Sequence, residues 1–359
     1  MCWIVLNGNK GEWSELYVFC YLLKEGILKT ADKDLNAVEN VYFPIVKIIR
    51  NENMGRVLDY CPGTMVKIYE GDTLIREIPN EEFAQIVDVL KDKIRTGRGR
   101  AFKISEVEDF FDDIFVCKVK ADSAHKQDID IQIHDMRTGM EPVCGFSVKS
   151  YFGGKPTLIN AVRGTNFIYE IENCNEQIAK TVNAIDTERK IIDKINFLLE
   201  NGCRFQRMNE MISSRFKENL EFVDSKMPAM LSEILLVAYK YGIKNMSEVV
   251  ERIKDINPLG YSNTHMYEYK IKKLLCACAL GMTPEKQWEG EEDASGGYIV
   301  VKKDGSVVCY HIYNRSEFEQ YLYDYTYFDK PSTSRHDYMT VYQEDGKYKI
   351  KFNLQVRFK

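Results

Sequence analysis

The segment from Asp128 to Tyr151, DIDIQIHDMRTGMEPVCGFSVKSY, constrains the fold more than any other part of the chain. Polar and apolar residues alternate at both of its ends, which is the pattern of two strands joined by a loop. Asp128 and Asp130 share one face of the first strand, and isoleucines occupy the other. Ser147 and Lys149 share one face of the second strand. Packing both apolar faces into one core leaves the acidic side chains able to face Lys149.

A carboxylate on one strand and a lysine on the next are typical of a Mg²⁺-dependent phosphodiesterase site. Carboxylates bind hard divalent cations, and a lysine can orient or deprotonate the attacking water and offset phosphate charge. The ordinary alternative is a half-buried hairpin whose polar face lies in water. Two features favour the functional interpretation. The two aspartates lack an adjacent basic residue, and Lys149 interrupts a largely apolar strand, where an unpaired charge costs free energy.

Composition indicates an ordinary globular protein. The chain has 359 residues, enough for two domains or one enlarged core, with 45% hydrophobic and 29% charged residues. Its net charge of −5 argues against a protein that coats nucleic acid indiscriminately. A nuclease remains compatible with this charge, because a metal site needs carboxylates and local basic patches can still contact phosphates.

Targeting and redox signals indicate a cytoplasmic protein without a membrane anchor. No apolar run approaches the ~18 residues of a membrane span, and the N-terminal residues lack the pattern of a signal peptide. The ten cysteines, from Cys2 to Cys309, form no CxxC pair or zinc-ligand spacing. We therefore expect reduced, mostly buried thiols.

The first part of the chain predicts a helix, several strands and a basic loop. The helix lies within Gly8–Leu28 and stops near Gly26; its Glu12 and Glu15 either lie in water near the helix N-terminus or deliver an acid to the metal site. Residues 40–79 alternate like strands, and Asn80 is expected to cap the next helix. That helix leads into a Gly-rich loop that either connects elements or follows a phosphate backbone. The basic residues of this region are Arg95, Arg98 and Arg100.

The part of the chain after Tyr151 is predicted to change from sheet to helices and then back to strands. Thr165–Glu172 is expected to form a third strand of the central sheet, residues 174–256 are mainly helical, and hairpins centre on Asp304–Gly305 and Asp345–Gly346. We expect three regions: a catalytic core over 1–173, a helical region over 174–290 and a β-rich region over 291–359 that contributes to DNA recognition.

Three segments, taken together, resemble the HpaII family of type II restriction endonucleases. They are NKGEWSELY, GFSVKSYFGGKPTLINAVRGTNFIYEI, and STSRH followed by NLQVRF, in the same order over nearly the whole chain. The resemblance implies an α/β (α+β) fold of the PD-(D/E)xK type, a mixed sheet flanked by helices. It also implies Mg²⁺-dependent cleavage of double-stranded DNA, and a cognate DNA methyltransferase that protects the host genome.

The chain departs from the plain superfamily pattern. No proline precedes either aspartate, and Ser147 stands where an acid is expected. We expect Asp130, with Asp128, to ligate Mg²⁺, and we favour Asp130 narrowly because it lies nearer the middle of the strand. Lys149 is expected to act on water or phosphate charge. Ser147 is expected to contribute a hydrogen bond, and a glutamate from a neighbouring element to replace the missing acid. The candidates for that glutamate are Glu170, Glu12 and Glu15.

Sequence recognition requires side chains that reach base edges, arginine for guanine above all. The first candidates are Arg335 and His336 in a polar loop, followed by Arg163 and Asn166. The alternative for the loop is a capped turn with its charges in water. The family resemblance suggests a short GC-rich palindrome such as CCGG, which favours a two-fold dimer on DNA.

Two other functions compete with this interpretation. Another PD-(D/E)xK-like nuclease, acting on repair intermediates or modified DNA, would share the metal site but need a different recognition surface. A non-catalytic DNA-binding or regulatory protein is suggested by the missing acid at Ser147. It would bind DNA without Mg²⁺ and would not cut it.

Overall fold

The computed structural model describes residues 6–119 and 127–359, so that Cys2 lies outside the described residues. The chain divides into two compact units. Unit 1 contains Met1–Pro156, Ala279–Gly281 and Glu292–Tyr321, and unit 2 contains Thr157–Cys278, Met282–Glu291 and Leu322–Lys359. Both units combine helices with sheets, which confirms the expected mixed α/β class. Within the described residues, no helix is long and apolar enough to cross a membrane.

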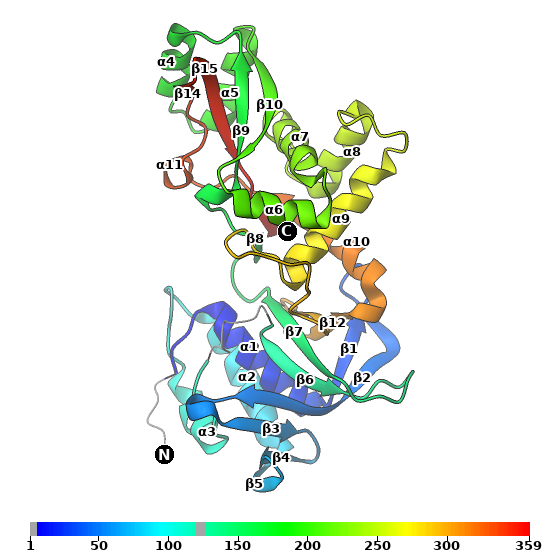
Figure 1. Ribbon diagram of the computed structural model, residues 1–359. Coiled ribbons are helices and arrows are strands. Elements are labelled where there is room, and N and C mark those ends of the chain that lie inside the picture. The colour runs from blue at the N-terminus through cyan, green and yellow to red at the C-terminus, as the bar shows by residue number, and fades with distance from the viewer. Residues whose placement is uncertain (1–5, 120–126) are drawn as a thin grey trace. The chain divides into compact units, whose positions relative to one another are not determined.

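Unit 1 is built on one large sheet, with helices α1 and α2 packed against each other (Figure 1). Its helices are α1 (Lys10–Glu25), α2 (Asn80–Thr96), α3 (Glu108–Asp113) and α10 (Arg315–Tyr325, of which Arg315–Tyr321 belongs to this unit). Its strands are β1 (Ile27–Ala31), β2 (Ala37–Asn51), β3 (Val57–Cys61), β4 (Met65–Glu70), β5 (Thr73–Pro79), β6 (Ile129–Ile133), β7 (Val143–Ser150), β11 (Gly297–Val301) and β12 (Val307–His311).

The nine strands follow the order β1-β12-β11-β7-β6-β2-β3-β4-β5, and β1 also pairs with β2. The β1–β2 pairing connects the first strand of this order back to the sixth. The long strand β2 can make it because it changes partners along its length. Its first part pairs with β1 as far as Pro44, and its second part pairs with β6 from Ile45 onward. Strand β7 lies between β6, which is antiparallel to it, and β11, which is parallel. The expected pair of strands around Asp128–Tyr151 is therefore confirmed.

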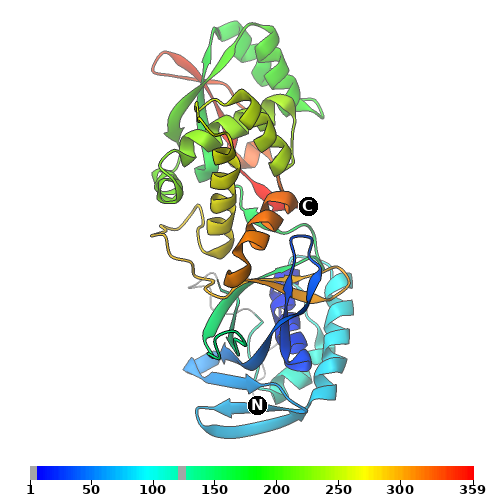
Figure 2. The ribbon, with the colours of Figure 1, turned by 90° about the vertical axis from the view of Figure 1, so that its right-hand side faces the viewer.

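One face of this sheet packs against α1 and α2 (Figure 2). The predicted helix α1 begins after Asn9, whose side chain accepts hydrogen bonds from the backbone of Gly11 and Glu12. It ends at Gly26, which adopts φ 67°, a left-handed conformation that glycine tolerates at a helix end. Phe146 and Val148 of β7 belong to the core on this face. Their alternation turns Ser147 and Lys149 to the opposite face.

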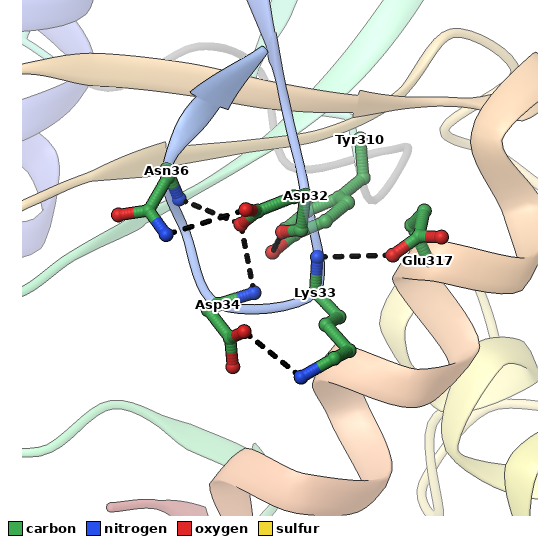
Figure 3. A network of polar contacts seen from close by, with 6 residues as sticks. All are labelled: Asp32, Lys33, Asp34, Asn36, Tyr310 and Glu317. Carbon is green, nitrogen blue, oxygen red and sulfur yellow. Dashed lines mark hydrogen bonds and ion pairs between the residues drawn. The ribbon is translucent and has the colours of Figure 1, made fainter.

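On that opposite face, α10 packs against aromatic residues of β11 and β12. Tyr310 stacks on Phe318 and Tyr321 of α10, with ring centroids 5.4 Å and 4.8 Å apart. Figure 3 shows how the turn between β1 and β2 fixes this arrangement. The backbone N–H of Lys33 donates to Glu317 of α10 (3.0 Å), and the Tyr310 hydroxyl donates to the carbonyl of Asp32 (2.7 Å).

Unit 2 contains a four-stranded sheet, ordered β10-β9-β15-β14, and a three-stranded sheet, ordered β13-β16-β8. Its strands are β8 (Thr157–Ile159), β9 (Asn166–Glu172), β10 (Arg204–Met211), β13 (Thr326–Phe328), β14 (Tyr342–Glu344), β15 (Lys347–Asn353) and β16 (Val356–Phe358). Its helices are α4 (Glu176–Ala184), α5 (Lys190–Glu200), α6 (Ser214–Val223), α7 (Met227–Tyr241), α8 (Met246–Ile256), α9 (His265–Leu280, of which His265–Cys278 belongs to this unit) and α11 (Thr333–His336).

Two expectations about individual elements were wrong. The strand predicted at Thr165–Glu172 exists as β9, but it belongs to the four-stranded sheet of unit 2 and not to the sheet that holds β6 and β7. Asn80 is the first residue of α2 rather than its cap, which is Pro79. The amide of Asn80 instead donates to the carbonyl of Lys24 at the end of α1 (3.1 Å), so that it joins two helices.

Candidate active site

Strands β6 and β7 bring the predicted catalytic residues together in unit 1. Asp130 lies opposite Gly145 in the ladder, between core residues Ile129 and Ile131, so its side chain points away from the core. The side chains of Ser147 and Lys149 project from the same face of β7. The two strands are neighbours in the sheet, and the alternation of their side chains puts a carboxylate and a lysine on one surface.

Asp128 is tied directly to β7. Its Oδ2 atom accepts a hydrogen bond from the Ser147 hydroxyl (3.2 Å) and another from the backbone N–H of Val148 (2.7 Å). Ser147 is fully buried, whereas Asp128 is only partly buried. Two donors to one carboxylate oxygen hold Asp128 in a fixed orientation beside the strand that carries Lys149. The predicted hydrogen-bonding role for Ser147 agrees with this geometry.

A residue that the sequence analysis missed completes this surface. Tyr298 of β11 pairs with Ser147, and the Lys149 ammonium lies 5.9 Å from the centre of its ring. Burial raises the pKa of the Tyr298 phenol well above its ordinary value, and nearby Tyr151 and Asp128 raise it further. The ring is therefore a neutral neighbour of Lys149 at physiological pH. No local pattern in the sequence pairs Tyr298 with a strand so far away along the chain.

The oxygen ligands on this surface fit Mg²⁺. Within the described residues, no group of three or more His, Cys, Asp or Glu side chains is arranged to hold a metal. Mg²⁺ does not require such a group, because it is usually bound through one or two carboxylates, several waters and the phosphates of the substrate. Asp128 and Asp130 supply hard carboxylate oxygens of the required kind. A site of this type is completed only when a substrate phosphate brings its own oxygens.

The three candidate glutamates have other surroundings. Glu12 closes the capping box of α1 by accepting a hydrogen bond from the backbone N–H of Asn9 (2.8 Å). Glu15 is partly buried one turn further along the same helix. Glu170 lies on β9 in unit 2, where it pairs with Lys347 (2.8 Å). The replacement of the missing acid by one of these residues stays a prediction.

The predicted DNA-binding arginines fall in both units. Arg95, Arg98 and Arg100 are exposed at the end of α2 and in the loop after it. In unit 2, Arg163 is exposed on the short 3₁₀ turn Arg163–Thr165, and Arg335 is exposed on α11.

The unit 2 candidates form a basic cluster. Burial lowers the pKa of His336, and the positive charges of Arg335 and Arg163 lower it further, which places both guanidinium groups near the imidazole. Asn166 differs from its neighbours, because its side chain is 1% exposed and donates to the carbonyl of His336 (2.9 Å). This geometry suits a residue that holds a loop better than one that reads a base.

Comparisons with known proteins agree over almost the whole chain. The family model described as HpaII restriction endonuclease matches residues 9–358. Among curated proteins, the chain is 37% identical over 359 residues to the type II restriction enzyme HpaII of Haemophilus parainfluenzae, which covers 98% of each chain. No solved structure matches.

Proposed function

The chain belongs to the HpaII family of restriction endonucleases, and we propose that it cuts double-stranded DNA through the polar face of β6 and β7. The observation that carries this proposal is the grouping of Asp128, Ser147 and Lys149, in which two hydrogen bonds fix the carboxylate beside the strand of the lysine. The match over nearly the whole chain gives the activity, a type II site-specific deoxyribonuclease. The strand geometry supports the proposal that the reaction occurs on this face.

Each residue of the site has a distinct task in hydrolysis. Lys149 orients the attacking water and offsets the charge that builds up on the phosphate in the transition state. Asp128 and Asp130 would hold Mg²⁺, which supplies Lewis-acid chemistry and lowers the pKa of water when bound. Ser147 positions Asp128. The Tyr298 ring lies beside the Lys149 ammonium in a cation–π contact and helps to hold it in place.

Asp128 is the stronger candidate for the principal ligand, although the sequence analysis favoured Asp130 because it lies nearer the middle of the strand. The carboxylate of Asp128 accepts a hydrogen bond from the backbone of β7, and its negative charge contributes to the raised pKa of Tyr298. Preorganised ligands lose little freedom when a metal and substrate bind. We therefore assign the principal metal contact to Asp128 and a supporting contact to Asp130.

The proposed substrate is a short GC-rich palindrome, CCGG, read in the major groove. Arginine binds the O6 and N7 atoms of guanine with two hydrogen bonds, so the exposed Arg163 and Arg335 suit such a site. A palindrome cut on both strands favours a two-fold dimer on DNA. A cognate methyltransferase would protect the host DNA at the same sequence.

The test is digestion of unmethylated phage DNA by the purified protein, with Mg²⁺ or with EDTA, followed by sequencing of the fragment ends. The proposal predicts discrete fragments that require Mg²⁺ and end within CCGG. Methylation of that sequence should protect the DNA. Well-folded protein that binds the DNA in EDTA but never cuts it would instead establish a non-catalytic DNA-binding protein.

A further inference from the structure

Two buried asparagines in unit 2 are bonded to each other between the turns that carry exposed arginines. Asn166 opens β9, Asn353 closes β15, and the two residues are partners in the ladder. The Asn353 amide donates to Oδ1 of Asn166 (2.7 Å). Their exposed fractions are 1% and 0%. Buried amide N–H groups are costly unless they are hydrogen-bonded, so the acceptors of these two side chains show what the pair holds in place.

Asn353 holds the turn that carries Arg163. Its amide also donates to the carbonyl of Val162 (2.9 Å) and to Oγ1 of Thr165 (3.1 Å), which flank Arg163 and Gly164. The Thr165 hydroxyl donates in turn to the carbonyl of Val162 (2.9 Å). Both ends of the turn are therefore fixed to one buried amide, while Arg163 itself projects into solvent.

Asn166 holds the turn that carries Arg335 and His336. Its amide donates to the carbonyls of His336 (2.9 Å) and Asp337 (3.3 Å), at the C-terminal end of α11. Carbonyls at a helix end lack partners within the helix and must find them elsewhere. The chain then leaves α11 through Asp337 at φ 52°, a left-handed conformation, so the end of this short helix depends on the Asn166 contact.

The two turns together present two arginine cations and an imidazole on a chain whose net charge is −5. Arg163 and Arg335 both lie close enough to His336 to act on its protonation. We infer that the Asn166–Asn353 pair positions a DNA-reading surface made of Arg163, Arg335 and His336. The inference rests on the proposed function. To recognise a base edge, an arginine must hold its guanidinium within a few tenths of an ångström of the required position. Two turns anchored independently would not fix the arginines relative to each other, whereas the asparagine pair links the two turns.

The test uses the full-length chain with Asn166→Ala and a matched control, Asn219→Ala. Asn219 is fully buried in the same unit, and its amide also donates to two backbone carbonyls, those of Thr283 (3.0 Å) and Lys286 (2.7 Å). Both variants lose comparable hydrogen bonds, so both should lose similar stability. The Asn219 amide, however, binds no turn of the basic cluster. Assays at a temperature where both variants remain folded separate positioning from stability.

Two measurements report on the cluster. The first is the discrimination in cleavage. It is the number of phage DNA fragment ends that fall at the principal cleavage sequence divided by the number at sequences that differ from it by one base pair. The second is the salt dependence of DNA binding, measured in EDTA with each substitution also placed in a Lys149→Ala chain. Since Asn166 carries no charge, a shallower salt dependence in Asn166→Ala can come only from displaced cations.

We expect Asn166→Ala to lower the discrimination between sites on the order of ten-fold, in the same direction as Arg163→Ala and Arg335→Ala. Asn219→Ala should discriminate like the wild type. Equal discrimination and equal salt dependence in the two asparagine variants would overturn the inference while leaving the nuclease intact. If the wild type itself gives no discrete fragments, the proposed function fails, and the inference fails with it.

Discussion

The carboxylate of Asp128 is held by Ser147 and by the backbone beside it, through hydrogen bonds of 3.2 Å to the Ser147 hydroxyl and 2.7 Å to the N–H of Val148. The serine that stands where an acid is expected therefore still has a role in the proposed site. It cannot ligate a metal as a carboxylate does, but it orients the carboxylate that can. The substitution leaves Lys149, two positions further along β7, on the same face.

The two aspartates should differ in their contribution to cleavage. Asp128→Asn keeps the shape of the side chain but removes its charge, and we expect the cleavage rate to fall roughly a hundred-fold or more. Asp130→Asn should cause a smaller loss. Single-turnover cleavage of one duplex by both variants, at saturating Mg²⁺, measures the order. A larger loss in Asp130→Asn would reverse the assignment of the principal ligand.

Ser147→Ala should have only a modest effect. The hydrogen bond from Val148 continues to hold Asp128, so we expect about 1 kcal/mol of lost stability and less than a ten-fold loss of rate. Urea unfolding and the same cleavage assay measure the two effects. A loss of rate as large as that of Asp128→Asn would mean that the serine acts on the reaction directly.

His311 should make unit 1 less stable in acid. It is 4% exposed at the end of β12, with its ring tilted against that of Phe43, and within the described part of the chain its Nε2 atom has no hydrogen-bond partner. Burial lowers its pKa from 6.5 to about 4, although the charge of Asp135 acts in the opposite direction. The folded state therefore favours the neutral imidazole.

The sign of the pH effect follows from that shift. Stability from a neutral His311 is fully present above pH 6.5 and is lost as the pH falls toward about 4, because the unfolded chain binds the proton first. The loss is on the order of 3 kcal/mol. The urea midpoint of the wild type should fall across this window, and that of His311→Phe should fall less. Parallel curves for the two proteins would contradict the prediction.

Local patterns in the sequence predicted the parts of the structure that depend on local chemistry. The alternation around Ser147 and Lys149 placed both on the polar face of β7, and Gly26 ends α1 as expected. The turns at Gly305 and Gly346 also join hairpin strands as predicted. In each case, side-chain periodicity or backbone conformation acts within a few residues.

Long-range pairing explains what the sequence could not predict. The strand that carries Glu170 has the same alternating pattern as β6, yet it pairs with β10 and β15 in unit 2. Tyr298 gained its place beside Lys149 through a parallel pairing that no nearby residue specifies. Asn166 was expected to contact DNA, and nothing in the residues around it shows that it pairs with the distant Asn353 and is buried there. Strand order decides all three.

Cleavage by Lys149→Ala tests the proposed site most directly. The variant should bind unmethylated DNA containing CCGG like the wild type and lose cleavage by roughly a hundred-fold or more, because the charge on the transition state loses its partner. Lys67→Ala is the matched control, since Lys67 is an exposed lysine on β4 of the same sheet. That variant should cut normally. Wild-type cleavage rates in a folded Lys149→Ala chain would contradict the assignment of the active site to β6 and β7.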